Sequence, residues 1–171
     1  MTVAYDGTYR PDAGSYHLPY ISILQENNNI KLHLIGKLQT NKVKFAVKIF
    51  DYIHSLDSEK LANKIASYQN QKIKLFIQVN IGNEEQKSGI SVNKLDDFYN
   101  FCKDLKLNVV GLMCIPPIDD NSVKYFKKML DLKQKHNFNE LSMGMSSDYL
   151  DALQHGSTFL RIGSDIFGKR N

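Results

Sequence analysis

The chain has 171 residues, of which 42% are hydrophobic and 23% charged, a composition typical of a soluble globular domain with a substantial core. No apolar run reaches the length of a membrane span, and the first residues lack the pattern of a secretory signal. The formal net charge is +4, but the lysines are scattered over several predicted helices and balanced locally by Asp and Glu, so no basic stripe indicates nucleic acid. The two cysteines make neither a disulfide framework nor a metal motif. We therefore expect a cytoplasmic protein with no metal, no membrane contact and no nucleic-acid partner.

From residue 31 onward, strand and helix patterns alternate. Short apolar or alternating runs predict strands at residues 32–35, 51–55, 72–80, 108–115, 140–142 and 158–162. Apolar residues at helical spacing predict helices between them, at residues 39–49, 58–68, 92–105, 122–135 and 147–154. Ser91 is the expected N-cap of the third helix, and Ser146 or Ser147 that of the last. Such alternation predicts an α/β protein with a parallel sheet, either open or closed into a barrel.

The first 30 residues differ from the rest of the chain. They contain turn sequences at residues 5–8 and 11–14 and no amphipathic helix before Ile21. We expect an irregular N-terminal segment over residues 1–30 and a β/α barrel domain over residues 31–171. A complete (β/α)8 barrel of roughly 250 residues uses about 31 residues per unit, so this chain would hold about six units. The prediction is an incomplete TIM-type barrel whose first two units are missing.

Two turns rich in small residues are the clearest indication of a ligand site. Residues 141–148 (Leu-Ser-Met-Gly-Met-Ser-Ser-Asp) and 161–164 (Arg-Ile-Gly-Ser) are each predicted to be a strand that ends in a turn. Such turns leave backbone N–H groups free to hold a phosphate. On local grounds Ser146 could also be only a helix cap, and Arg161 could pair with a carboxylate such as Asp165.

Five motifs in order resemble the pyridoxal phosphate homeostasis protein family, which shares the barrel of the alanine racemase N-terminal domain. They are residues 33–42 (His-Leu-Ile-Gly-Lys-Leu-Gln-Thr-Asn-Lys), 78–80 with 87–89, 111–113, 142–146 and 161–168. The resemblance covers about residues 31–170. It implies a protein that binds pyridoxal 5′-phosphate and buffers or delivers it, in vitamin B6 and amino-acid homeostasis, without established turnover.

The resemblance also implies where the cofactor phosphate would be held. Met145 and Ser146 would bind it through backbone N–H and hydroxyl groups, together with Gly163 and Ser164 after the last strand. This agrees with the general preference of such barrels for a phosphate site after the seventh and eighth strands.

Three further residues are implied around the cofactor ring. Arg161 would lie near the pyridine nitrogen and keep it unprotonated, which weakens the ring as an electron sink. His33 and Asn41 would line the mouth of the same barrel face. On the residues alone, His33 could be a hydrogen-bonded strand histidine, and Asn41 an ordinary residue of a helix surface.

The chain departs from the family pattern at its N-terminal end. Family members carry a Schiff-base lysine on the first barrel strand, in an Ala-Val-Ser-Lys-like segment, and a Gly-Glu-Asn-Tyr-like turn after the next strand. Neither is found, and no lysine precedes Lys31. We therefore expect a truncated or divergent member that binds the cofactor non-covalently, if it binds it, and has no catalytic residue. Lys87 is interpreted as a solvated loop lysine and not as a substitute.

Two alternatives stay open. The chain could be a pyridoxal phosphate-dependent racemase or decarboxylase of fold type III, which would need an imine-forming lysine and a positioned acid–base group. It could also be a non-functional remnant whose open sheet edge favours aggregation or dimerisation. The expected partner is a small-molecule cofactor, and the expected state is a monomer or a weak homodimer.

Overall fold

A curved parallel sheet forms the centre of the molecule. The computed structural model describes residues 2–5, 30–68, 72–118 and 121–163. Within them the sheet has the order β1-β2-β3-β4-β6-β7-β8, and the short β5 pairs with β4. The strands are β1 (Thr2–Tyr5), β2 (Lys31–Leu34), β3 (Tyr52–Leu56), β4 (Lys74–Asn80), β5 (Ile90–Ser91), β6 (Val109–Met113), β7 (Glu140–Met145) and β8 (Phe159–Arg161). Because every pair is parallel, the carboxyl ends of all strands lie at one end of the sheet.

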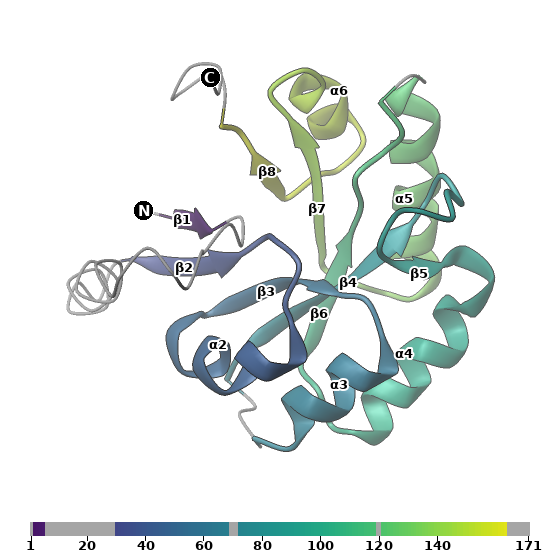
Figure 1. The fold of residues 1–171 in the computed structure, drawn as a ribbon. Coiled ribbons are helices and arrows are strands. Elements are labelled where there is room, and N and C mark those ends of the chain that lie inside the picture. The colour runs from purple at the N-terminus through teal and green to yellow at the C-terminus, as the bar shows by residue number, and fades with distance from the viewer. Residues whose placement is uncertain (1, 6–29, 69–71, 119–120, 164–171) are drawn as a thin grey trace.

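Helices follow the strands and lie outside the curve of the sheet (Figure 1). They are η1 (Thr40–Lys42), α2 (Val43–Ile49), α3 (Glu59–Ala66), η2 (Val92–Lys94), α4 (Leu95–Asp104), α5 (Ser122–Lys135) and α6 (Tyr149–Gln154). The six strands predicted from residue 31 onward are all present, with shifted ends. The predicted α/β class and incomplete TIM-type barrel are therefore confirmed.

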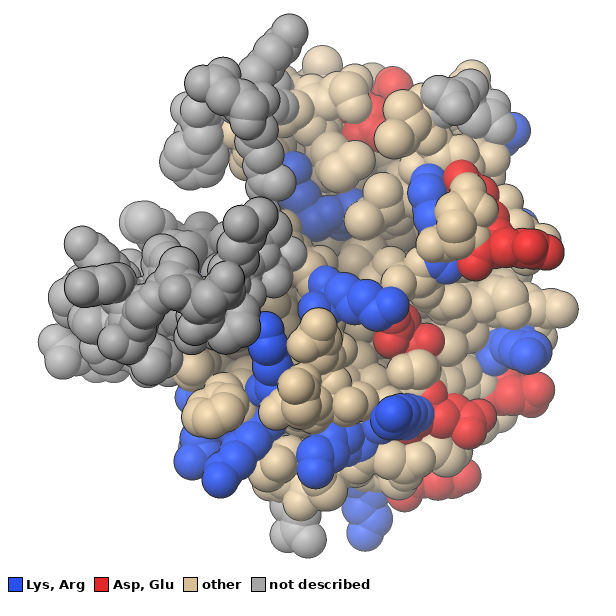
Figure 2. Space-filling view, viewed as in Figure 1, with Lys and Arg blue, Asp and Glu red and all other residues tan. Residues whose placement is uncertain are grey.

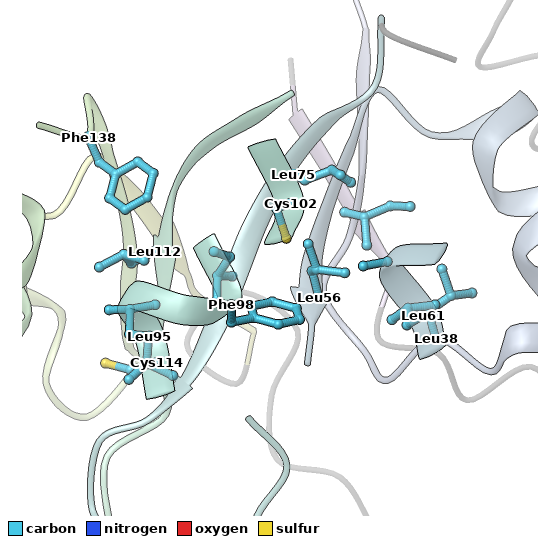
Figure 3. Packing of buried hydrophobic residues seen from close by; sticks show 14 of the residues in the cluster. Leu38, Leu56, Leu61, Leu75, Leu95, Phe98, Cys102, Leu112, Cys114 and Phe138 are labelled. Carbon is cyan, nitrogen blue, oxygen red and sulfur yellow. The ribbon is translucent and has the colours of Figure 1, made fainter. Parts of the chain in front are cut away.

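The main hydrophobic core lies between the sheet and its outer helices. In α4 the apolar side chains recur at helical spacing, which turns one face of the helix toward the strands. Figure 3 shows these side chains against apolar residues of the sheet; the labelled residues include Leu95, Phe98 and Cys102 of α4 and Leu56, Leu75 and Leu112 of the strands. Each such leucine stabilises the fold by roughly 1.5–3 kcal/mol relative to exposure. This layer holds the strand ends in place.

Gly111 sets the spacing between β6 and β7. A Cβ at this position would overlap the backbone carbonyl of Glu140 on β7. Two positions further along the same ladder, Met113 pairs with Ser142. Any side chain at residue 111 would therefore force the two strands apart next to Ser142.

The N-terminal segment contains one strand that was not predicted. Thr2–Tyr5 forms β1 and pairs in parallel with β2, from Thr2 opposite Lys31 to Tyr5 opposite Leu34. The expectation of irregular chain is wrong for these residues, because pairing with a neighbouring strand overrides the adjacent turn sequences. The rest of that expectation falls on residues 6–29, outside the described part of the chain. The boundary between residues 30 and 31 stays a prediction.

The structure also corrects two predicted caps. The last helix begins at Tyr149 with Asp148 as its N-cap, so Ser146 and Ser147 lie in the preceding turn. Ser91 precedes the short η2, and its side chain makes no capping hydrogen bond. In both places a turn or a 3-10 helix precedes the α-helix, so the capping position is displaced along the chain.

The surface carries both signs of charge. Lys and Arg side chains gather over α2 and α3 at the lower left of Figure 2, while basic and acidic side chains lie interspersed toward its right edge. No helix in the described ranges is long and apolar enough to cross a membrane. The absence of a nucleic-acid partner stays a prediction.

Candidate functional site

A chain of polar side chains crosses the inside of the barrel. Arg161 Nη1 donates a hydrogen bond to Ser142 Oγ at 2.9 Å. His54 Nδ1 lies 2.8 Å from the same Oγ, and His54 Nε2 lies 2.9 Å from Nδ1 of His33. These four residues come from β8, β7, β3 and β2, and we call them the interior polar chain. Apart from Arg161, which is half-buried, its members are at most 3% exposed.

Aromatic rings surround the two histidines. The His33 ring stacks on Tyr52 with centroids 4.1 Å apart and planes at 7°. The His54 ring stacks on Phe76 with centroids 4.2 Å apart, and Phe159 meets it edge-on at 82°. These packed rings leave the imidazoles little access to water, so a charge on either one is unfavourable.

Both histidines are therefore neutral near pH 7. Burial lowers the pKa of His33 from 6.5 to about 4, against a smaller opposing effect of the Asp51 carboxylate. The pKa of His54 is lowered to about 3, mainly by burial and to a smaller extent by electrostatic interaction with His33 and Arg161. Each neutral ring offers one N–H donor and one nitrogen acceptor, which is what a continuous hydrogen-bonded chain requires.

Arg161 is the charged end of this chain. Besides its bond to Ser142, its Nη2 donates to the carbonyl oxygen of Cys114 at 2.8 Å. Burial lowers the pKa of Arg161, while the nearby Cys114 and Asp148 raise it. The guanidinium stays charged, because an arginine side chain is not deprotonated in proteins. Two of its five N–H groups are used by these bonds, so the rest can meet a ligand.

The first predicted phosphate turn lies beside Arg161. Met145, at the end of β7, is the register partner of Arg161 on β8. Its backbone N–H, expected to hold phosphate, donates instead to the Asp148 carboxylate at 2.7 Å. Gly144 adopts a φ of +93°, which starts the turn. Ser146 is half-buried, and within the described residues the structure shows no hydrogen-bond partner for its N–H or hydroxyl.

The second predicted turn begins just after Arg161. Gly163 is exposed, and a Cβ added to it would meet no described atom within 4 Å. This is open space beside backbone that follows β8. Ser164, and with it Asp165, the alternative partner of Arg161, lie outside the described residues.

The two remaining site residues are separated by the structure. His33 lies inside the barrel, 3% exposed and hydrogen-bonded to His54. Asn41 lies on η1 in the outer helical layer and is exposed. There it helps to line an open groove of about 480 Å³ between η1 and α3, with Thr40, Lys60, Asn63, Lys64 and Ser67. The hydrogen bonds of the interior polar chain do not include Asn41.

The sequence reasoning missed His54 and Ser142. Both lie in predicted strands; His54 was treated as an ordinary strand residue, and Ser142 belongs to the motif at residues 142–146 but was not assigned a role in the site. A usable signal was the alternation in β3, where Tyr52 and His54 bracket Ile53, since such alternation sends polar and apolar residues to opposite faces. Among the described residues, no group of three or more His, Cys, Asp and Glu side chains could hold a metal ion.

Comparison with known proteins identifies the class of domain. Residues 22–171 match the family model for the alanine racemase N-terminal domain. Alanine racemase from Corynebacterium glutamicum superposes with a TM-score of 0.67 at 14% identity, covering 90% of this chain and 46% of that one, a likeness of fold alone.

Two closer relatives narrow the class. A pyridoxal phosphate homeostasis protein of Aquifex aeolicus (strain VF5) is 37% identical over 83% of this chain and 68% of its own length. The structure of PipY from Synechococcus elongatus PCC7942, with PLP bound, superposes with a TM-score of 0.74 at 31% identity, covering 88% of this chain and 76% of that one. The chain therefore belongs to the pyridoxal phosphate homeostasis protein family.

Proposed function

We propose that this chain binds pyridoxal 5′-phosphate without catalysing a reaction, and that it buffers or delivers this cofactor. The observation that carries the proposal is the half-buried Arg161 guanidinium, held by Ser142 and Cys114 at the carboxyl end of the strands, with N–H groups to spare. Relatives named pyridoxal phosphate homeostasis proteins, and PipY with PLP bound, support the choice of ligand. Cytoplasmic location and a monomeric or weakly dimeric state remain part of the proposal.

The described residues fit this ligand at both of its ends. Among the described residues the Ser146 N–H and hydroxyl have no hydrogen-bond partner and no atom fills the space beside Gly163, so a phosphate could lie across the two turns. Ser164 would complete this set by its position in the sequence. Arg161 would face the ring, with His33 behind it at the far end of the interior polar chain. Met145 would act by placing Ser146, because its own N–H is bonded to Asp148.

Asn41 belongs to this proposal only indirectly. Its side chain lines the groove between η1 and α3, so it would influence the site through the loop that follows β2. We therefore expect substitution of Asn41 to change cofactor affinity less than substitution of Arg161.

We propose that binding is non-covalent. When bound, the cofactor supplies a phosphate and an aldehyde that can react with amines. No lysine precedes Lys31 in this sequence. Lys87 is engaged, since its Nζ lies 2.6 Å from a Glu84 carboxylate oxygen and donates to the Pro116 carbonyl at 3.3 Å. A lysine held as a charged partner is a poor nucleophile.

The interior histidines also favour a non-catalytic role. Proton transfer at neutral pH needs an acid–base group with a pKa near 7. The interior histidines have pKa values of about 4 and about 3, and three of their four ring nitrogens are hydrogen-bonded within the interior polar chain. A racemase or decarboxylase role would need another group.

The test is a titration of the purified chain with pyridoxal 5′-phosphate, followed by thermal unfolding. A ligand selective for the folded state at 100 times its Kd adds about 2.7 kcal/mol to the free energy of unfolding, so the unfolding midpoint should rise. Pyridoxal, which lacks the phosphate, is the matched control and should stabilise less. Borohydride treatment and intact mass should show no added cofactor.

Three outcomes would each contradict part of the proposal. An unchanged unfolding midpoint at saturating cofactor would show that the chain does not bind it. A borohydride-stable adduct that maps to one lysine would show covalent attachment. Racemisation of alanine by the purified chain would overturn the non-catalytic part.

A further inference from the structure

We propose that Ser142 and His54 are positioning residues that fix the Arg161 guanidinium, so that the site selects ligands whose aromatic ring presents an unprotonated nitrogen acceptor. The inference rests on the proposed function. It deepens it by assigning ring selectivity to buried residues that would not themselves touch the ligand. The observations that carry it are the unbroken contacts from Arg161 to His33 and their burial.

The available donors and acceptors allow only one direction of hydrogen-bond donation along the interior polar chain. Arg161 can only donate, so Ser142 Oγ accepts from it. Among the described residues, the one acceptor in contact with the Ser142 hydroxyl proton is Nδ1 of His54. His54 then carries its proton on Nε2 and donates it to Nδ1 of His33. If His33 donated to His54 and His54 donated to Ser142, the fully buried Ser142 hydroxyl would have no acceptor among the described residues, which is unfavourable.

This direction of donation strengthens the hydrogen bond between Arg161 and Ser142. A cationic donor polarises the serine hydroxyl, which then donates more strongly to the imidazole behind it. The aromatic rings fix the imidazoles in turn, since His54 stacks on Phe76 and His33 on Tyr52. With Nη2 bonded to the Cys114 carbonyl, the guanidinium is held at two points and cannot rotate freely.

A fixed guanidinium can select between aromatic rings. Its remaining N–H groups can donate to a ring nitrogen that has a lone pair, and they repel a ring that carries a proton or an alkyl cation there. The neutral histidines add no second charge. A guanidinium free to rotate would still attract the phosphate but would discriminate poorly between rings.

The first measurement uses the chain without ligand. In ¹⁵N NMR of the wild type, the Arg161 Nη groups should give separate signals because rotation is restricted. Ser142→Ala removes one of the two fixed points and should merge or broaden them. His54→Phe keeps an aromatic ring against Phe76 but removes the acceptor behind Ser142, and should have an effect in the same direction. Ser55→Ala is the matched control, since Ser55 is buried on the same strand but donates to the Gly36 carbonyl.

The second measurement compares pyridoxal 5′-phosphate with its 1-deaza analogue, in which a C–H group replaces the ring nitrogen. The wild type and Ser55→Ala should prefer the natural cofactor by roughly ten-fold, the factor expected for one hydrogen bond to a charged group. Ser142→Ala and His54→Phe should bring the ratio of affinities close to one.

The outcomes separate this inference from the proposed function. If the two variants weaken both ligands equally and leave the Arg161 signals unchanged, the role is merely structural and the inference is wrong. If the wild type binds the cofactor with no preference over the analogue, selectivity is disproved while the proposed function stands. If the wild type binds neither ligand, the proposed function fails, and the spectra still decide whether Ser142 and His54 position Arg161.

Discussion

Arg161 and Ser142 lie on neighbouring strands, 19 residues apart in the sequence, and are joined by a 2.9 Å hydrogen bond from Nη1 to Oγ. The direct register partner of Ser142 on β8 is Phe159, and that of Arg161 is Met145. The long arginine side chain thus reaches back along the barrel interior to the next polar position of β7. Its second bond, to the Cys114 carbonyl after β6, ties three strands together at one guanidinium.

Arg161→Lys should weaken both the fold and the site. A lysine ammonium is a single point donor and cannot bond Ser142 and the Cys114 carbonyl with the geometry of the guanidinium. We expect a loss of about 1–3 kcal/mol in the free energy of unfolding from the unpaired acceptor. Urea denaturation should show this loss, and a titration should show roughly ten-fold weaker cofactor binding. Unchanged stability would mean that neither bond matters in solution.

Stability should fall as the pH drops below about 6.5. The pKa values of His33 and His54 in the folded chain, about 4 and about 3, lie below the unfolded value of 6.5. Between these values the unfolded chain binds more protons than the folded one, so acid favours unfolding. The slope is about 1.4 kcal/mol per pH unit for each histidine, and the loss ends below the folded pKa values.

Urea denaturation of the wild type at pH 7, 6 and 5 measures this slope. His54→Phe is the matched variant, because it removes this one titratable group and leaves every carboxylate and every other histidine in the sequence. The free energy of unfolding of this variant should fall less steeply with decreasing pH, because its unfolding takes up about one proton fewer. Equal slopes would show that His54 is not buried in its neutral form.

Gly144→Ala should lower stability, whereas Gly163→Ala should lower cofactor affinity. At Gly144 the φ of +93° and a Cβ only 2.6 Å from the Ala152 Cβ predict a loss of about 1 kcal/mol or more in stability. At Gly163 the added methyl meets no described atom within 4 Å, so stability should change by less than about 0.5 kcal/mol. The methyl would instead occupy space proposed for the phosphate. Thermal unfolding with and without cofactor distinguishes the two, and undiminished affinity in Gly163→Ala would exclude Gly163 from the site.

Asp148→Asn should strengthen phosphate binding. The asparagine amide oxygen can still accept from the Met145 N–H, so the turn keeps its hydrogen bond. Removal of a negative charge beside the proposed phosphate should raise cofactor affinity roughly five-fold, the factor for ~1 kcal/mol. The gain should shrink with added salt and be absent for pyridoxal. An equal gain for pyridoxal would place the carboxylate near the ring instead.

Both cysteines should be unreactive in the folded chain. Burial raises the pKa of Cys102 and of Cys114 to about 12, so almost no thiolate forms at pH 8. Iodoacetamide at pH 8 should therefore label neither residue until denaturant is added. Rapid labelling of Cys114 alone would show that the strand end next to Arg161 opens in solution.

The sequence predicted the layers better than the interior of the barrel. The helix at Ser122–Lys135 was predicted to the residue because its apolar positions recur at a regular helical spacing. The pairing of His33 with His54 could not be read in the same way. It depends on β2 lying beside β3, with Tyr52 opposite His33, and on the curvature that brings Ser142 across from His54. Neither is encoded in local periodicity.

The turn after β7 shows a second limit. A serine-rich segment before a helix predicts a cap at Ser146 or Ser147, and Asp148 follows as an equally good cap residue. In the structure Asp148 is the N-cap residue, and its carboxylate accepts a hydrogen bond from the Met145 N–H. Competition between neighbouring residues of similar capping strength decides the helix start, and only tertiary contacts determine the outcome.

Because Gly111 has no side chain, the spacing between β6 and β7 could influence which ligand the protein binds. β6 and β7 approach closely because residue 111 carries no Cβ, and two positions further along that ladder Met113 pairs with Ser142. If Gly111 were alanine, β7 would move outward and the serine oxygen with it, lengthening its bonds to Arg161 and His54. A single methyl group outside the site, at a position that contacts no ligand, would then alter which aromatic ring the protein accepts.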